Sequence, residues 1–243
     1  MFTTEYYQTI TDILNLVYEQ EHEKIDFAGK KIADVVSVDG LVHVFGCGHS
    51  HMLSEEMFYR AGGLITINPI FEQSVMLHEG AIKSSHIERM SGYAEYVLER
   101  YEIQAKDVFL ISSSSGINPF PIEMAEEAKK RGAFVIGITS GNYKNSPSRD
   151  VRGIHLQDIC DLYIDNHVPH GDAVVEVDDS GIKAGPVSSI SCFFIANSMM
   201  LAACEELKKR GVKPPVFKSG NIEGGDKHNL QMLGTYMTRI KHL

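Results

Sequence analysis

Short apolar runs rich in β-branched residues alternate with stretches of helical periodicity along most of the chain. The runs that have the composition of buried strands are Leu41–Gly46, Leu64–Ile70, Asp107–Ser112, Ala133–Thr139 and Asp161–Asn166. Strands that alternate with helices predict a parallel sheet covered by helices on both faces. The pattern therefore predicts an α/β fold, a three-layer α/β/α sandwich around a mostly parallel five-stranded sheet.

The stretches of helical periodicity predict where the helices begin and end. Residues 4–37 predict two helices with a break near Phe27–Gly29, and further helices are expected at 51–61, at 72–101 in up to two pieces, at 121–131 and at 187–209. Residues 173–185 alternate around a DSG turn and predict a small hairpin at the sheet edge. After an irregular segment, a last helix is expected to begin at His228 and Asn229.

No repeat or linker-like stretch divides the chain, so residues 1–243 are predicted to form one domain. It would consist of a helical segment 1–38, a core of about 30–210 and a tail 211–243 with a helix. The hydrophobic fraction of 43% is enough for one sizeable core in a chain of this length.

Charge and hydropathy narrow the class of protein. The net charge of −9 disfavours binding to nucleic acid or to an acidic membrane, because both need a basic surface. The apolar runs are short, and the amino-terminal segment lacks the basic start and apolar centre of a signal peptide. We therefore expect no transmembrane helix and a cytoplasmic location.

The familiar cofactor motifs are incomplete. A dinucleotide-binding turn would need a third glycine where His51 stands, and no glycine-rich loop ends in Lys followed by Ser or Thr, which disfavours NAD and ATP. The four cysteines form no CxxC pair and are expected to be reduced thiols. His49 and His51 supply at most two metal ligands, and no third is evident. We expect neither a metal nor another cofactor.

Glycine and serine gather after two of the predicted strands. Gly46–Ser50 follows the first strand, and Ser112–Gly116 follows the third, directly before a helix opened by proline. In doubly wound sheets, ligands bind beyond the carboxyl ends of the strands. Hydroxyls together with free helix N–H groups suit an anion. The alternative is that the serines only cap the helix, but one serine would be enough for a cap, so the pattern favours an anion site.

Two segments resemble the SIS (sugar isomerase) domain family, GCGHS after the first strand and ISSSSGINPFPIEMAEEAKKRGAFVIGITS from the third, within a likeness over residues 30–210. The chain is similar to uncharacterised single-domain members and, more distantly, to phosphoheptose isomerases. The resemblance implies a flavodoxin-like fold and a phosphorylated sugar or amino sugar as ligand. The ligand would be bound by the residues that match the two turns of the family, which are Gly48, His49, Ser50, Ser113, Ser115, Gly116 and Asn118.

The resemblance does not extend to the catalytic residues. Phosphoheptose isomerases carry a His and a Glu one turn apart where this chain has Glu56 and Arg60, and their His and Gln on the last long helix are absent here. An aldose–ketose isomerase needs a carboxylate to move a proton between adjacent carbons. Glu79, beside Gly80 after the second strand, is the first candidate for this base, and Glu55 is the second.

His228 is a third candidate for catalysis, from the tail. Members of the family are commonly dimers or tetramers, and some complete a site with a His of the neighbouring chain, so we expect a homo-oligomer. The first functional hypothesis is a phosphosugar-binding enzyme, a sugar-phosphate isomerase or a related amino-sugar phosphate enzyme. The alternative is a non-catalytic module that senses a phosphosugar.

Overall fold

The centre of the molecule is a sheet of five parallel strands in the order β2-β1-β3-β4-β5, in a computed structural model that describes all residues 1–243. The strands are β1 (Val42–Gly46), β2 (Ile67–Pro69), β3 (Val108–Ser112), β4 (Phe134–Thr139) and β5 (Leu162–Asp165). This order is the flavodoxin-like one, so the predicted sheet is confirmed. Each strand is shorter than its apolar run, because the ends of the runs continue into turns.

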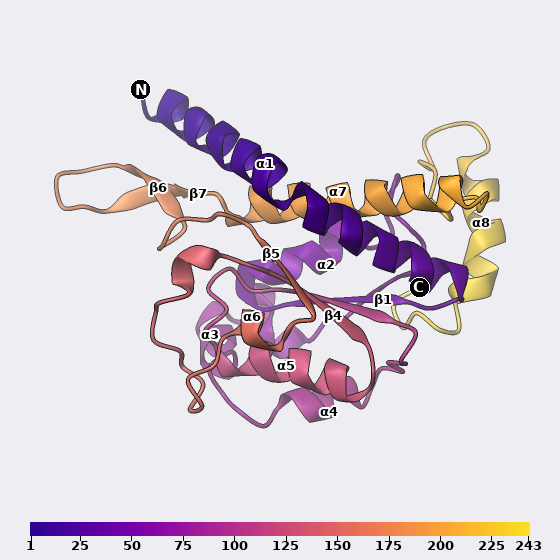
Figure 1. Ribbon diagram of the computed structural model, residues 1–243, viewed down its shortest axis with the longest axis horizontal. Helices are drawn as coiled ribbons and strands as arrows, with labels where there is room; N and C mark the ends of the chain where they lie inside the picture. The colour runs from indigo at the N-terminus through magenta and orange to yellow at the C-terminus, as the bar shows by residue number, and fades with distance from the viewer.

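Helices cover both faces of the sheet (Figure 1). One face carries α1 (Phe2–Ser37), α2 (Met52–Met57) and α7 (Ser188–Lys209). The other carries α3 (Ala81–Ile87), α4 (Ala94–Leu98), α5 (Pro119–Lys130) and α6 (Leu156–Ile159). Successive strand residues alternate between the two cores, since Val44 packs with α1 and α7 while Phe45 packs with α4 and α5. The predicted three-layer sandwich is confirmed.

The amino-terminal segment is one continuous helix, so the predicted break near Phe27–Gly29 was wrong. Gly29 lies where α1 crosses α7, and a Cβ on it would be 2.5 Å from the Cβ of Ala202 and 2.9 Å from the backbone N of Ala203. The absence of a side chain lets the two helices approach closely. The glycine is therefore a packing residue and does not end the helix.

We expect Gly29→Ala to lower the free energy of unfolding by about 1–2 kcal/mol. Overpacking of about 1–3 kcal/mol outweighs the gain of up to about 1 kcal/mol that alanine brings to a helix. The control is Gly234→Ala in α8 (Gly225–Tyr236), where a Cβ meets nothing within 4 Å, and it should raise stability slightly. Urea denaturation measures both, and a stabilised Gly29→Ala protein would contradict the close-packing explanation.

The segment after β2 is more broken than expected. Residues 72–101 form two 3₁₀ turns, η2 (Gln73–Val75) and η3 (Leu77–Glu79), followed by α3 and α4. Gly80 and Gly92 have φ angles of +127° and +82°, and these conformations interrupt a helix. The helix predicted at 51–61 is also shorter: the 3₁₀ turn η1 (Gly48–His51) leads into α2, which ends at Met57 because Phe58 is extended and Tyr59 has a φ angle of +45°. A further turn, η4 (Gly141–Tyr143), follows β4.

The predicted hairpin exists, but its placement at the edge of the main sheet was wrong. β6 (Ala173–Glu176) and β7 (Lys183–Pro186) form a separate antiparallel pair. The pair extends from the body near the start of α1 (Figure 1). There the Tyr6 hydroxyl donates to the carbonyl oxygen of Pro186 at 2.6 Å.

The carboxyl-terminal tail packs at the end of the sheet where the strands begin. Phe217, Tyr236 and Ile240 are buried in one cluster with Leu41 and Ile65, which lie just before β1 and β2. The last helix, α8, begins at Gly225, somewhat earlier than predicted. The tail is therefore docked on the domain.

Helix α7, predicted from the sequence at 187–209, is long and apolar enough to cross a membrane by length and composition alone. Its buried residues, among them Ile195, Met199 and Ala203, belong to the core cluster that also contains residues of α1 and the sheet. This is the position of a core helix in a layered fold.

Candidate functional site

The two glycine and serine turns meet at the carboxyl edge of the sheet. β1 and β3 are neighbours, and their last residues, Gly46 and Ser112, are paired in the register. The chain leaves β1 toward β2 on one side and leaves β3 toward β4 on the other. This is the topological switch point, where open α/β sheets bind their ligands.

The first turn depends on glycine at two positions. A Cβ on Gly46 would collide with the carbonyl oxygen of Ser50, so only glycine lets η1 fold back onto the strand end. Gly48 has a φ angle of +55°, in the left-handed region. The backbone N–H groups of Gly48 and His49 have no acceptor in the protein. The turn thus offers donors at the mouth of the switch point.

The second turn, Ser113–Asn118, is the serine loop. Gly116 has a φ angle of +62°, and a Cβ there would lie 2.7 Å from Oγ1 of Thr139. Its N–H donates to the Ser113 hydroxyl at 3.3 Å, and its carbonyl oxygen accepts from the N–H of Leu156 at 2.9 Å. These contacts fix the curvature of the loop.

Four backbone N–H groups of the serine loop have no acceptor in the protein, those of Ser114, Ser115, Ile117 and Asn118. The side chains of Ile117 and Asn118 are buried, and buried N–H groups without a partner are rare in proteins. Successive N–H groups on a curved loop form an anion-binding nest. The loop therefore has the geometry of an anion site before any ligand is present.

A small hollow of about 10 Å³ opens between the two turns and the start of α7. Its polar wall consists of His49, Ser50, Ser112, Ser114, Ser188 and Ser189, and its apolar corner of Leu53, Cys192 and Phe193. Of the predicted ligand-binding residues, His49 and Ser50 line it. Two further serines line it, Ser112 at the end of β3 and Ser114 of the serine loop, whereas Ser113 and Ser115 do not.

The start of α7 is a third wall that the sequence analysis missed. Asp172, at a φ angle of +67°, accepts from the N–H groups of Val187 at 3.0 Å and of Ser188 at 2.8 Å, and from the Ser188 hydroxyl at 2.8 Å. The carboxylate caps the helix and orients its first turn. The paired serines at 188 and 189, shortly after Pro186, were the available signal.

Side-chain hydrogen bonds connect the floor of the hollow. Asn166, fully buried after β5, donates to the Ser114 hydroxyl at 3.4 Å and to Sγ of Cys192 at 3.4 Å. Ser112 contacts the same sulfur at 3.6 Å. Burial raises the pKa of the Cys192 thiol, so this sulfur stays protonated near neutral pH and does not act as a nucleophile. All four cysteines are free thiols, as predicted.

The side chain of Asn118 is already engaged. Its Nδ2 donates to Oε1 of Glu88 at 2.8 Å, and its Oδ1 accepts from Nη1 of Arg149 at 2.8 Å. Burial raises the pKa of Glu88, although the bond from Asn118 and the charges of Arg149 and Arg89 oppose the rise. The free N–H of Asn118, rather than its amide, is the group open to a ligand.

The candidate bases lie near the first turn but do not line the hollow. Glu55 is exposed, and its Oε1 lies 3.3 Å from Nε2 of His51, the residue after Ser50. The ring of His78 is 6.1 Å from the ring of His51, and its neighbour Glu79 is exposed beside Lys83 at 4.0 Å. Glu55 therefore lies beside His51, next to the site, and Glu79 follows the histidine whose ring lies near that of His51.

His228 lies at the other end of the sheet. It belongs to the first turn of α8, and its Nε2 is 3.0 Å from the carbonyl oxygen of Val216 in the docked tail. It cannot contribute to the hollow of its own chain. The positions of the family's metal-linked pair hold Glu56 and Arg60, which form an ion pair, and no group of three metal-binding side chains is present.

Comparison with known proteins identifies the class. A family model described as SIS domain matches residues 5–140. A UPF0309 protein of Halalkalibacterium halodurans is 43% identical over 238 residues, which cover 98% of this chain and 95% of that protein. The chain therefore belongs to the SIS domain family, and within it to the UPF0309 proteins. The resemblance seen in the sequence is confirmed.

Solved structures share the fold at low sequence identity. A phosphoheptose isomerase from Francisella tularensis has a TM-score of 0.54 and 13% identity, over 84% of this chain and 96% of that one. The Vibrio vulnificus NanR protein, complexed with ManNAc-6P, has a TM-score of 0.51 and 15% identity, over 100% of this chain and 71% of that one. These likenesses support the fold.

Proposed function

We propose that this chain binds a phosphorylated sugar or amino sugar at the switch point between β1 and β3, with the phosphate in the serine loop. The observation that carries the proposal is the set of unpartnered N–H groups of Ser114, Ser115, Ile117 and Asn118. A phosphate provides several strong acceptors for such donors and needs few cationic side chains when N–H groups surround it. The SIS family membership and the complex of NanR with ManNAc-6P agree with this ligand class.

We further propose that the protein is a sugar-phosphate isomerase or a related amino-sugar phosphate enzyme. The sugar would lie at the mouth of the small hollow beside the loop, where its hydroxyls would meet the serine-rich wall. Glu79 and Glu55 remain the candidate bases. Glu55 lies beside His51 of the first turn, and Glu79 follows His78, whose ring is 6.1 Å from that of His51, so a side-chain rotation is needed to bring either carboxylate to the mouth of the site.

A sensing function is the second candidate, and one observation favours it. Both candidate bases are exposed and already lie beside a basic side chain, Glu55 beside His51 and Glu79 beside Lys83, and neither lines the hollow. Incubating the protein with a panel of phosphosugars and following their NMR signals separates the two functions. Interconversion with turnover identifies an enzyme, whereas binding without conversion identifies a sensor.

We propose a homo-oligomer in the cytoplasm as the working form. Exposed apolar side chains on α1 and α7, such as Tyr18 and Leu201, line one groove with Phe194 and would be covered by another copy. Only in such an assembly could His228 serve a site, that of a neighbouring chain. Light scattering gives the molecular mass.

We expect Ser115→Ala to weaken phosphosugar binding by about 1.5–3 kcal/mol, the range for hydrogen bonds to charged groups. The Ser115 side chain is partly exposed and makes no hydrogen bond within the protein. Calorimetry with the best ligand of the panel measures the loss, and the unphosphorylated sugar should bind as it does to the unaltered protein. Ser37→Ala is the control, since Ser37 is exposed at the last position of α1, at the end of the sheet where β1 begins. Equal losses for both ligands would refute the phosphate assignment.

A further inference from the structure

Arg149 is fixed against the serine loop at two points. Its backbone N–H donates to the carbonyl oxygen of Ile117 at 2.9 Å, and its Nη1 donates to Oδ1 of Asn118 at 2.8 Å. Ile117 and Asn118 are two of the residues whose own N–H groups lack acceptors. The guanidinium therefore lies at the rim of the anion-binding loop, and the residue is exposed.

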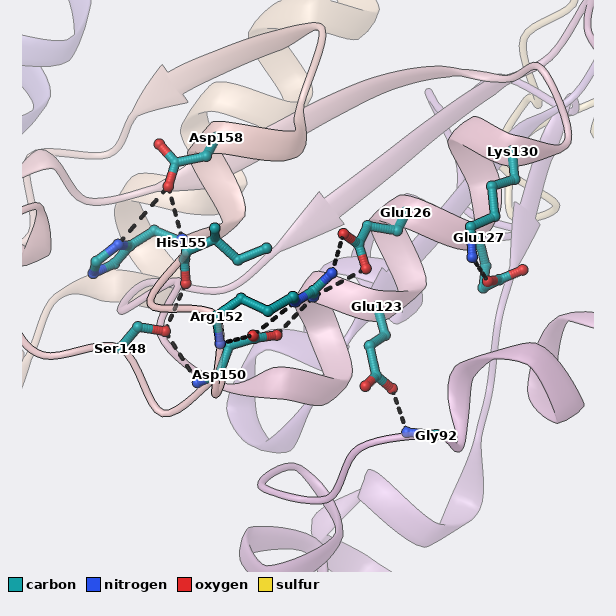
Figure 2. A network of polar contacts seen from close by, with 11 residues as sticks. Gly92, Glu123, Glu126, Glu127, Lys130, Ser148, Asp150, Arg152, His155 and Asp158 are labelled. Atoms are coloured by element: carbon teal, nitrogen blue, oxygen red, sulfur yellow. Dashed lines mark hydrogen bonds and ion pairs between the residues drawn. The ribbon is translucent and has the colours of Figure 1, made fainter.

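The segment that carries Arg149 is held on α5 and on the loop. Figure 2 shows Arg152 between Asp150 and Glu126 of α5, with Nη1 at 2.7 Å from Glu126 and Nη2 at 2.7 Å from Asp150. The Ser148 hydroxyl donates to the carbonyl oxygen of Ile154 at 2.6 Å and accepts from the N–H of Asp150 at 3.0 Å. Contacts on both sides of Arg149 thus restrict its backbone, and the guanidinium is presented from a rigid base.

The two arginines of this segment differ in their partners. Arg152 is neutralised by two carboxylates, whereas Arg149 makes no ion pair and bonds only the neutral amide of Asn118. The carboxyl of Glu88 lies on the other side of that amide, and burial, which raises its pKa, disfavours its negative charge. An arginine without a carboxylate partner at an anion-binding loop has donors to spare, since a guanidinium has five N–H donors in total.

We propose that Arg149 binds the phosphate group that the serine loop holds. The inference rests on the proposed phosphosugar function. It adds one side chain that binds the ligand, and the group that this side chain binds is a phosphate monoester dianion. Arginine matches phosphate with two parallel N–H donors. A local cation also offsets the repulsion that a chain of net charge −9 exerts on an anionic ligand.

Calorimetry with the tightest-binding phosphosugar of the panel tests the proposal on four variants of the full chain. Arg149→Ala and Arg149→Gln should weaken binding by about 10- to 100-fold, since a charge-assisted bond is lost in both. Arg149→Lys should retain part of the affinity because it keeps the charge without the paired donors. Arg89→Ala is the control, because it removes the same charge near Glu88 from a residue that does not bond the loop. The phosphosugar affinity of this variant should stay within about threefold of that of the unaltered protein, as expected of a screened surface charge.

The Arg149→Gln variant separates binding from loop structure. Glutamine still offers a neutral donor toward Asn118, so thermal unfolding at an unchanged temperature together with weakened phosphosugar binding assigns the loss to the ligand. The unphosphorylated sugar should bind both proteins equally. Unchanged phosphosugar affinity in Arg149→Gln, with the unaltered protein binding normally, overturns the assignment of Arg149 alone. An unaltered protein that binds no phosphosugar overturns the proposed function and this inference with it.

Discussion

Replacing Gly116 by alanine is expected to abolish most phosphosugar binding, with a loss of at least about 100-fold. The φ angle of +62° costs an L-residue about 1–2 kcal/mol. The added Cβ would also lie 2.7 Å from Oγ1 of Thr139 and 3.4 Å from Cβ of Leu156. The loop must shift to relieve the contact, and displacing two of its free N–H groups removes two charge-assisted hydrogen bonds of about 1.5–3 kcal/mol each.

Gly153→Ala is the matched control for this change. Gly153 has a φ angle of +74° with nothing within 4 Å of a Cβ, so the substitution carries the same backbone cost without the collision. It should lower thermal stability to a similar extent while phosphosugar affinity stays the same. Calorimetry compares the two variants at a temperature where both are folded. A folded Gly116→Ala protein that keeps its affinity would show that the loop curvature is not needed for binding.

Asp107→Ala is expected to lower the free energy of unfolding by about 3–5 kcal/mol, the cost of breaking a buried charged network. The carboxylate is buried before β3 and accepts from the N–H groups of Leu41 at 2.8 Å and Gln104 at 2.9 Å. It also lies 3.1 Å from Nε2 of the buried His43, whose Nδ1 is 3.1 Å from Asn68. Without the carboxylate, these buried donors lose their acceptor.

The same network predicts an acid dependence. Burial acts to raise the pKa of Asp107, but hydrogen bonds from His43, Leu41 and Gln104 outweigh it, and the pKa lies below its ordinary value. Because the pKa of Asp107 is lower in the folded than in the unfolded protein, its carboxylate stabilises the fold fully at pH values above the ordinary pKa, about 3.9 for Asp. The contribution is lost as the pH falls through the lower pKa of the folded state.

Urea denaturation at pH 7 and in steps below pH 4 measures both effects. Asp107→Asn should remove this part of the acid dependence, because an amide does not titrate. Asp179→Ala, at an exposed position of the β6–β7 turn, should leave stability unchanged. An Asp107→Ala protein as stable as the unaltered one at pH 7 would contradict the role of the network.

Much of the fold could be predicted because its signals are local. The strands β1, β3 and β4 are apolar on both faces, and such runs identify buried parallel strands without knowledge of their neighbours. The two turns could be recognised because glycine is needed for backbone geometry at Gly46, Gly48 and Gly116. The two short glycine turns therefore indicated both the resemblance to the SIS family and the location of the anion site.

Where the prediction failed, the deciding contact was remote in sequence. Gly29 has the appearance of a helix breaker, but Ala202 on α7 makes it a packing position. His228 stands at the start of a helix in a long tail, yet the docking of Phe217 and Tyr236 at the beginning of β1 places it away from the site of its own chain. The residues next to Gly29 and His228 in the sequence do not reveal these long-range contacts.

The sequence by itself determined the α/β/α class, the switch point and the turns that meet there, because backbone conformation and strand burial are encoded within a few residues. Only the tertiary structure decided which side chains meet at the site. It directed Ser112 and Ser114 to the hollow, closed that hollow with the first turn of α7, and brought Arg149 to the serine loop. The physical reason is that side-chain direction at a strand end, and the contacts between distant segments, depend on how the layers pack rather than on the composition of any one stretch.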